Sequence, residues 1–193
     1  MLFSTTIIIL FSYLHMLGPV LGPSAPDALN DAAGEYFGAG CSLSPVTLNL
    51  TQSDVKALKN ECGSGLDAED VQVWQIKKGS AVQAYAFIDN VKGKVRQITY
   101  TVLVSPDGKV AGMEILKYRE SHGGEVGHSM FRDQFTGKSA SDDLALGKDI
   151  RNISGATISC RSVTKGVKSI LHMYSYLKKS GKLQANAGYT TNG

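Results

Sequence analysis

Apolar residues after Ser162 recur at the spacing of a helix. They are Val163, Val167, Ile170, Leu171, Tyr174 and Leu177. Intervals of three and four residues place these side chains on one helical face and do not fit the alternation of a strand. Ser159 and Ser162 are suitable N-cap residues at the start. The pattern predicts a long amphipathic helix near the end of the chain.

The middle of the chain is typical of β-structure, because short runs rich in Val, Ile, Tyr and Phe are separated by turn residues. The expected strands cover residues 71–74, 82–88, 95–104 and 110–118, with turns at residues 89–94 and 105–108 and a short helix at residues 51–61. Ser-Pro-Asp-Gly at residues 105–108 is a strong turn signal and predicts a hairpin. Together these elements predict an α+β fold, an antiparallel β-meander packed with helices.

Residues 1–26 contain no Lys, Arg, Asp or Glu, and Ile7 to Phe11 is the centre of an apolar stretch. Such a segment is typical of a secretory signal peptide or an uncleaved membrane anchor. His15, Gly18 and Pro19 interrupt it, which favours a signal peptide. A buried core helix is the alternative, and the lack of charge argues against it. We therefore expect export, to the periplasm or to an outward-facing position on the membrane.

The expected domain organisation follows from these boundaries. Residues 27–50, which begin rich in Ala and Gly, are expected to form a linker. Residues 51–184 are expected to form one domain, and residues 185–193 a flexible tail. The net charge is +3 with both signs interspersed, so neither nucleic acid nor a polybasic membrane patch is indicated.

The cysteines Cys41, Cys62 and Cys160 match no metal-ligand spacing. In an oxidising compartment Cys41 and Cys62 could form a disulfide. Cys160 would then be an odd thiol, either a small buried apolar side chain or a redox group close to Thr157.

Residues 153–159, Ile-Ser-Gly-Ala-Thr-Ile-Ser, place a hydroxyl behind two small residues and before the predicted helix. Gly155 and Ala156 leave room for another active site to approach Thr157 closely. A helix N-terminus also favours an anion such as a phosphodiester. An ordinary helix start without chemistry is the simpler interpretation, since Ser, Thr and Gly are common there.

The run from Gly147 to Ser159 resembles the flavinylation motif of the FMN-binding domain family, which includes covalent-FMN subunits of the Rnf complex and of the sodium-pumping NADH:quinone reductase. The resemblance implies that Thr157 is esterified to FMN phosphate by an FAD:protein FMN transferase that uses FAD and magnesium. It further implies cofactor contacts from the residues around the acceptor, namely Ser154, Gly155, Ala156 and Ser159.

A second run, residues 118–126 followed by residues 131–138, is similar to a segment of NosR-like members of this family. It adds Glu120, His122, Gly123, Gly124 and Lys138 as expected cofactor-binding residues. Lys138, Gln134 and Arg119 are candidates to balance the negative charge of reduced flavin or of its phosphate. Together the two runs cover about residues 80 to 180.

The match has one notable departure. Many members of the family carry an acidic residue six positions before the acceptor, where this chain has Arg151. Asp149 lies two positions earlier and is a candidate substitute. A metal site formed by His122, His128, Glu120 and Glu125 is an alternative use of the second run, although their spacing matches no standard helical ligand pair.

The sequence therefore predicts an exported flavoprotein that carries FMN covalently on Thr157. It would act as an electron-transfer carrier between membrane or extracytoplasmic redox partners rather than as a stand-alone enzyme. Two alternatives remain open: a module that binds FMN non-covalently, for example as a sensor in a membrane regulatory system, and a small flavin reductase. The sequence contains no G-x-G-x-x-G dinucleotide fingerprint to favour the reductase.

Overall fold

The computed structural model describes residues 24–62 and 66–183. The helices are α1 (Asp27–Phe37), α2 (Gln52–Cys62), α3 (Ser129–Arg132) and α4 (Thr157–Lys179), with 3₁₀ turns η1 (Gly124–Gly127) and η2 (Asp133–Phe135). The strands are β1 (Cys41–Val46), β2 (Gln72–Lys78), β3 (Ala81–Lys92), β4 (Gln97–Val104) and β5 (Val110–Lys117). The predicted α+β class is confirmed, as is the short helix expected at residues 51–61.

The strands form one five-stranded sheet in the order β1-β2-β3-β4-β5, and every neighbouring pair is antiparallel. This is the predicted meander. The β4–β5 hairpin turns at Gly108, whose φ of 89° suits glycine and whose N–H donates to Ser105 O at 2.8 Å. The β3–β4 turn comes later than expected, at residues 93–96, because β3 continues through the buried Val91 to Lys92.

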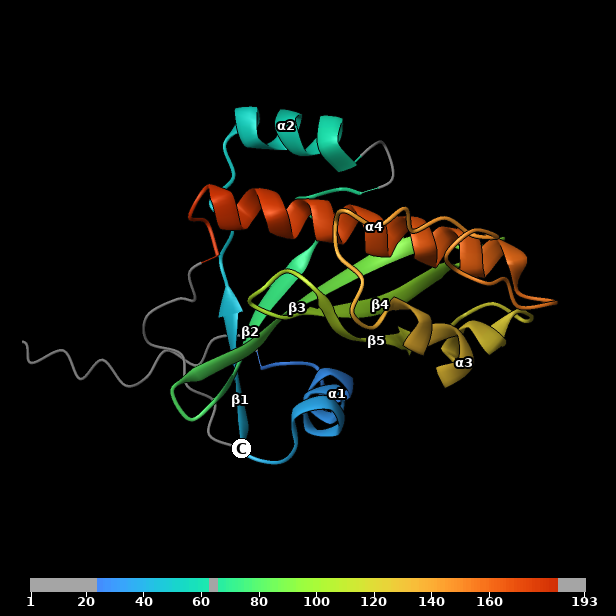
Figure 1. Ribbon diagram of the computed structural model, residues 1–193, viewed down its shortest axis with the longest axis horizontal. Coiled ribbons are helices and arrows are strands. Elements are labelled where there is room, and N and C mark those ends of the chain that lie inside the picture. The colour runs from blue at the N-terminus through green and yellow to red at the C-terminus, as the bar shows by residue number, and fades with distance from the viewer. Residues whose placement is uncertain (1–23, 63–65, 184–193) are drawn as a thin grey trace, which may run out of the picture.

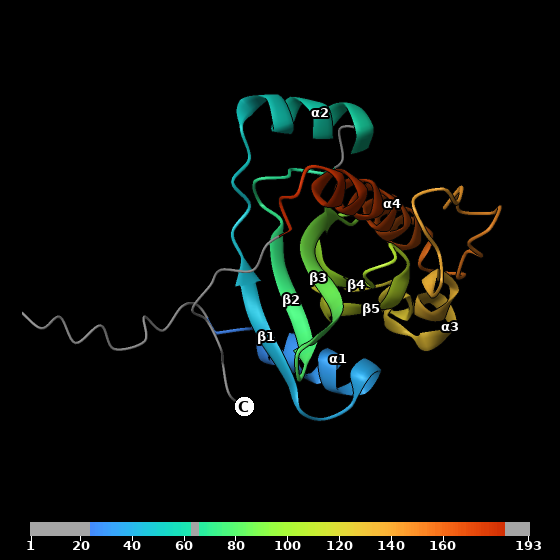
Figure 2. The same cartoon turned by 60° about the vertical axis from the view of Figure 1, so that its left-hand side comes forward.

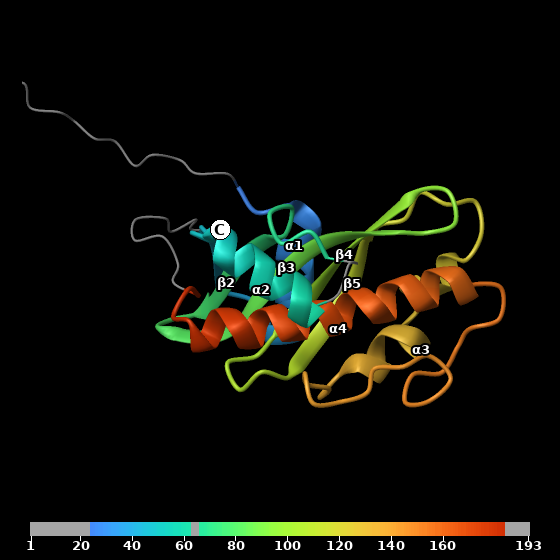
Figure 3. The same ribbon diagram turned by 90° about the horizontal axis from the view of Figure 1, so that it is seen from above.

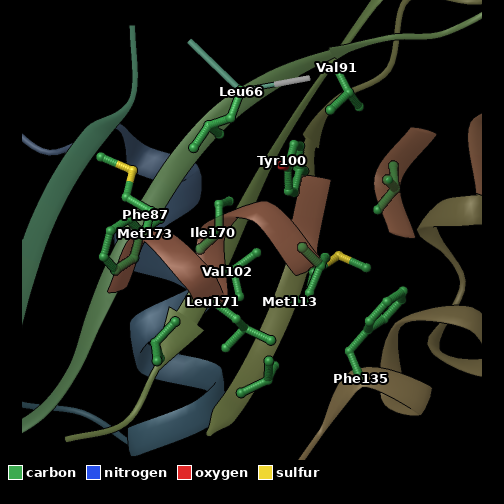
Figure 4. Packing of buried hydrophobic residues seen from close by; sticks show 14 of the residues in the cluster. Leu66, Phe87, Val91, Tyr100, Val102, Met113, Phe135, Ile170, Leu171 and Met173 are labelled. Carbon is green, nitrogen blue, oxygen red and sulfur yellow. The ribbon is translucent and has the colours of Figure 1, made fainter. Parts of the chain in front are cut away.

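Helices cover both faces of the sheet (Figures 1 and 2). The long helix α4 crosses one face, α2 packs on the far side of α4, and α1 packs on the opposite face of the sheet. The main core lies between α4 and the sheet and joins Phe87, Val102 and Met113 of the strands to Ile170 and Leu171 of α4 (Figure 4). The amphipathic pattern of residues 163–177 is thus explained by burial against β3 and β4.

Helix α4 lies close to the sheet at Gly166. A Cβ atom at this position would lie 2.1 Å from the Tyr100 hydroxyl and 2.9 Å from Val91 Cγ1, so no larger residue fits without movement. The buried Tyr100 hydroxyl donates to Asp89 Oδ2 at 2.8 Å. Burial raises the pKa of the Asp89 carboxyl, and this hydrogen bond partly offsets that shift.

The expected linker at residues 27–50 is wrong for the part that contains α1 and β1. Leu29 and Ala33 of α1 are buried in a second cluster with Ile76 of β2, and β1 pairs with β2 along its own whole length. Tyr36 lies over Gly112 of β5, where a Cβ atom would be 2.4 Å from the tyrosine ring. The small residues of this segment therefore pack closely and do not act as a spacer.

Helix α2 is fixed to the end of α4 by Asp54. Its carboxylate accepts hydrogen bonds from the Thr51 hydroxyl at 2.6 Å and the Tyr176 hydroxyl at 2.7 Å, and Lys182 Nζ lies 3.0 Å away. These hydrogen bonds, led by those from Thr51, hold the pKa of the Asp54 carboxyl well below its usual range.

The disulfide that Cys41 and Cys62 could form is not present in the described part of the chain, where the three cysteines are free. Cys41 lies at the start of β1, with its Sγ 3.3 Å from Gly38 O. Cys62 packs at the end of α2, 3.3 Å from Ser169 O of α4, and burial raises its pKa to about 11. Cys160 is fully buried, in agreement with the structural interpretation of that thiol.

The predicted signal peptide or anchor falls mostly outside the described residues, as does the predicted tail at residues 185–193. Within residues 24–62 and 66–183, none of the helices combines the length and the apolar character that crossing a bilayer requires.

Candidate functional site

Thr157 is the first residue of α4, and this places the predicted acceptor at a helix N-terminus. Figure 3 shows the whole length of α4 from above. The turn before it closes through a hydrogen bond from Ala156 N–H to Ile153 O, and Gly155 has a φ of 83° that favours glycine. The expected caps Ser159 and Ser162 are wrong, because the helix begins earlier and Ala156 is its N-cap. No side chain caps this end, so the first N–H groups have no intrahelical partner.

A cavity of about 400 Å³ opens beside Thr157. Three segments meet there, namely the β3–β4 turn, the loop after β5 and the first turn of α4. The lining residues are Lys94, Val95, Glu120, Ser121, His122, Gly155, Ala156, Thr157, Ile158 and Ser159. Six of the residues expected from the sequence are thus brought to one place: Glu120, His122, Gly155, Ala156, Thr157 and Ser159.

Tyr118 joins the loop after β5 to the first turn of α4. Its hydroxyl donates to His122 O at 2.6 Å and lies 2.9 Å from the Ser159 hydroxyl. Gly123 fits underneath with a φ of 88°, and a Cβ atom there would be 2.7 Å from the Tyr118 oxygen. Burial raises the pKa of the Tyr118 phenol, so it stays a neutral hydrogen-bonding group. Gly123 therefore packs against Tyr118 and does not line the cavity.

Glu120 joins the same loop to the β3–β4 turn. Its Oε1 accepts hydrogen bonds from the backbone N–H groups of Val95 at 2.6 Å and Arg96 at 2.9 Å. These two bonds lower the pKa of the Glu120 carboxyl, which keeps it ionised at neutral pH. The Glu120 carboxylate thus binds backbone N–H groups of the β3–β4 turn.

The Thr157 hydroxyl has a partner that the sequence analysis missed. Asn152 Nδ2 donates a hydrogen bond to Thr157 Oγ1 at 2.9 Å. Because Asn152 is the donor, this bond leaves the hydroxyl proton of Thr157 uncommitted. The only signal in the sequence for this contact was that Asn152 lies close to the motif. The two side chains are five residues apart in the chain, and they meet only because the turn at residues 153–156 folds back.

The run at residues 131–138 supports the segment that leads to Thr157. Gln134 Oε1 accepts from Arg151 N–H at 2.7 Å, and its Nε2 donates to Arg151 O at 3.4 Å. Lys138 Nζ lies 3.4 Å from Asp149 Oδ2, and Asp149 accepts from the backbone N–H of Ala145 at 2.7 Å. Asp149 is therefore engaged in holding its own loop.

Several expected residues lie away from the cavity. Lys138 pairs through its backbone with Val110 at the start of β5, whereas the cavity lies beyond the other end of that strand. Arg119 donates to Gln97 O at 3.3 Å and Thr99 Oγ1 at 3.0 Å. Ser154 and Gly124 are exposed and do not line the cavity. The cation that the structure brings to the cavity is Lys94, which the sequence analysis did not single out.

The alternative of a metal site finds no support in the described ranges. Among those residues no group of three or more His, Cys, Asp or Glu side chains is arranged to hold an ion. Glu120, the central member of that alternative, binds backbone N–H groups instead.

The comparison with known families agrees with this geometry. Residues 93–172 match the profile of the FMN-binding domain. The chain contains a domain of this family. The matched region begins at the β3–β4 turn and ends within α4, so it includes all three segments around the cavity.

Relatives of the chain are found among the components of ion-translocating complexes. The chain is 30% identical over 136 residues to the G subunit of the Na⁺-translocating ferredoxin:NAD⁺ oxidoreductase complex of Acetobacterium woodii, covering 65% of this chain and 66% of that protein. It is 38% identical over 100 residues to the G subunit of the proton-translocating ferredoxin:NAD⁺ oxidoreductase complex of Clostridium ljungdahlii, covering 48% of this chain and 54% of that protein. The chain thus spans less than two thirds of the length of these relatives.

The residues around the cavity fit FMN in charge and polarity. The uncapped start of α4 offers N–H groups suited to a phosphate. Val95 and Ile158 add apolar side chains suited to an aromatic ring, and Lys94 adds a cation. Together these features match a ligand with an anionic end and a flat apolar end.

Proposed function

We propose that this protein is an exported flavoprotein that carries FMN through a phosphoester to Thr157 and transfers electrons between membrane or extracytoplasmic redox partners. The observation that supports it most directly is the position of Thr157 at the uncapped start of α4, on the wall of a cavity within an FMN-binding domain. Thr157 is half-buried, and its hydroxyl oxygen accepts a hydrogen bond from Asn152.

The attachment reaction is a transfer from FAD. The Thr157 oxygen attacks the phosphorus on the FMN side of the FAD pyrophosphate, the bond to the AMP phosphate breaks, and AMP leaves. The hydroxyl proton passes to a base, which we assign to a transferase that also supplies magnesium. This chain supplies the acceptor, holds it in place, and gives the new phosphodiester a helix N-terminus to lie against.

The bound flavin supplies reversible electron acceptance, and the surrounding residues of this chain adjust it. Lys94 lines the cavity and would stabilise negative charge on the reduced ring. A membrane redox partner is consistent with the relatives, which are named as components of ion-translocating oxidoreductase complexes. A covalent tether suits an exported protein, because flavin lost outside the cytosol is not readily replaced.

The test is the intact mass of the protein after coexpression with an FAD:protein FMN transferase. We expect a gain equal to FMN less water in the wild type and in Thr157→Ser, and no gain in Thr157→Ala. A peptide fragment should place the adduct at Thr157. Unmodified mass in the presence of an active transferase would contradict the proposal, and flavin released by acid precipitation would favour non-covalent binding instead.

A further inference from the structure

Two large apolar side chains at the cavity are exposed to solvent. Val95, at the tip of the β3–β4 turn, is 70% exposed, and Ile158, in the first turn of α4, is 46% exposed. Both line the cavity beside Thr157 although they belong to segments more than sixty positions apart in the chain. Large apolar groups brought together at the rim of a cavity are suited to contact with an apolar ligand surface.

The turn that carries Val95 is held by the neighbouring loop. Within the turn, Gly93 N–H donates to Arg96 O at 2.8 Å, which closes the hairpin. From outside it, Glu120 Oε1 binds the N–H groups of Val95 and Arg96, at 2.6 and 2.9 Å. The fit is close, because a Cβ atom on Gly93 would lie 2.5 Å from Glu120 Oε1. Two charge-assisted hydrogen bonds thus fix the residue whose side chain reaches the rim.

The loop itself is fixed to α4, so the position of Val95 relative to Ile158 is determined. Tyr118, two residues before Glu120, bonds His122 O and contacts the Ser159 hydroxyl, and Ser159 is the neighbour of Ile158. The path from Ile158 to Val95 therefore runs through hydrogen-bonded groups. A change at Glu120 breaks this path at the turn and leaves the connection to α4 intact.

We propose that Glu120 is a positioning residue that holds the β3–β4 turn over the cavity, so that Val95 and Ile158 contact the isoalloxazine ring of the flavin. The inference rests on the proposed attachment of FMN to Thr157. It gives Glu120 a different role from the expected one, since the carboxylate acts through Val95 and does not need to touch the cofactor. It also makes Val95 a contact residue that no motif in the sequence indicates.

The test measures access to the ring in the flavinylated protein, by the quenching of flavin fluorescence with iodide. We expect Glu120→Ala to increase the quenching constant severalfold, because the turn loses both hydrogen bonds to the carboxylate. Glu120→Gln keeps a side-chain oxygen that can accept, so it should restore much of the protection. Glu61→Ala, a change of an exposed glutamate at the end of α2, is the matched control and should behave as the wild type.

Val95→Ala provides a second variant in case Glu120→Ala disturbs folding. Val95 is mostly exposed, so its truncation should leave thermal stability unchanged while it raises the quenching constant. Intact mass is recorded for every sample. A missing adduct in the wild type would count against the tether itself. A complete adduct with equal quenching in the wild type, Glu120→Ala and Val95→Ala would overturn the role assigned here to Glu120.

Discussion

At the scale of single residues, the side chains around Thr157 have separate tasks. Asn152 donates to the acceptor oxygen, Glu120 holds the β3–β4 turn, and Tyr118 connects the loop after β5 to Ser159 of α4. None of these bonds consumes the proton of the Thr157 hydroxyl. The hydroxyl of the proposed acceptor is therefore oriented in advance, while its hydrogen stays available for transfer.

Removal of the Asn152 amide should slow attachment of the flavin. We expect Asn152→Ala to reduce the rate of FMN transfer by about fivefold, since a neutral hydrogen bond contributes about 1 kcal/mol. The measurement is the time course of the mass gain with purified transferase and FAD. Asn49→Ala, an exposed asparagine before α2, is the control. Equal rates for Asn152→Ala and the wild type would show that the hydrogen bond does not orient the acceptor.

The sequence was sufficient to predict that Thr157 lies at a helix start, because its motif combines a small residue and a glycine with the amphipathic pattern that follows. It was not sufficient to predict the hydrogen bond from Asn152 or the position of Lys94 at the cavity. Their positions depend on how two turns fold back toward the cavity, and neither turn has a periodic pattern that places its side chains. Lys138 shows the same limit, since adjacency to a motif placed it near the flavin and the fold places it at the other end of β5.

At the scale of elements, α3 and η2 act as a support for the segment that leads to α4. Phe131 and Phe135 are fully buried and meet edge to face, with ring centroids 5.2 Å apart. Their burial presents Gln134 to the backbone of Arg151. The neighbouring Met130 points outward and is 73% exposed. Together α3 and η2 thus have one buried aromatic side and one polar side, which binds the loop before α4.

Truncation of the buried Phe131 ring in α3 should lower the stability of the fold. We expect Phe131→Ala to lower the free energy of unfolding by about 3–5 kcal/mol, as for other buried aromatic residues. Met130→Ala, the adjacent exposed position, should change it by less than about 0.5 kcal/mol. Urea unfolding followed by tryptophan fluorescence provides both values. Similar losses in the two variants would mean that the side chains do not differ in burial as described.

The elements that could be predicted are those with a clear period. Residues 163–177 and the strands of the meander have one, and α4 and β2 to β5 confirm them. Residues 27–46 do not, because α1 buries only Leu29 and small alanines, and β1 contains Pro45. A segment rich in small residues resembles a linker in sequence, yet those residues permit the close packing of α1 beneath the sheet.

At the scale of the whole molecule, the layers are connected in series: α1, the sheet, α4 and α2 (Figure 2). The outermost contact, between α2 and α4, includes the ionised Asp54 and its bonds to Thr51 and Tyr176. Ser169 and Cys62 add a second contact, in which the Ser169 hydroxyl donates to Cys62 O at 2.9 Å. The outer layer is therefore held in part by a charged side chain.

The Asp54 contact should make part of the stability depend on pH. The pKa of Asp54 is lowered by folding, so its contribution is fully present above the ordinary aspartate range and is lost as the pH falls through the lowered value. Asp54→Asn should therefore have a lower melting temperature than the wild type at pH 7, and the difference should shrink toward about pH 3. A difference that is constant across this range would contradict the assignment of the effect to the carboxylate.

Gly166 connects the packing of the whole molecule to its chemistry. Because this residue has no side chain, α4 can rest directly on Tyr100, and the helix axis is set at that height above the sheet. Thr157 lies nine residues earlier on the same rigid helix, about 13 Å away along its axis. We expect a side chain at position 166 to push α4 away from Tyr100 and so to shift its first turn. If Thr157 carries the flavin as proposed, a substitution in the core at Gly166 should therefore change how the flavin is placed, although residue 166 does not contact it.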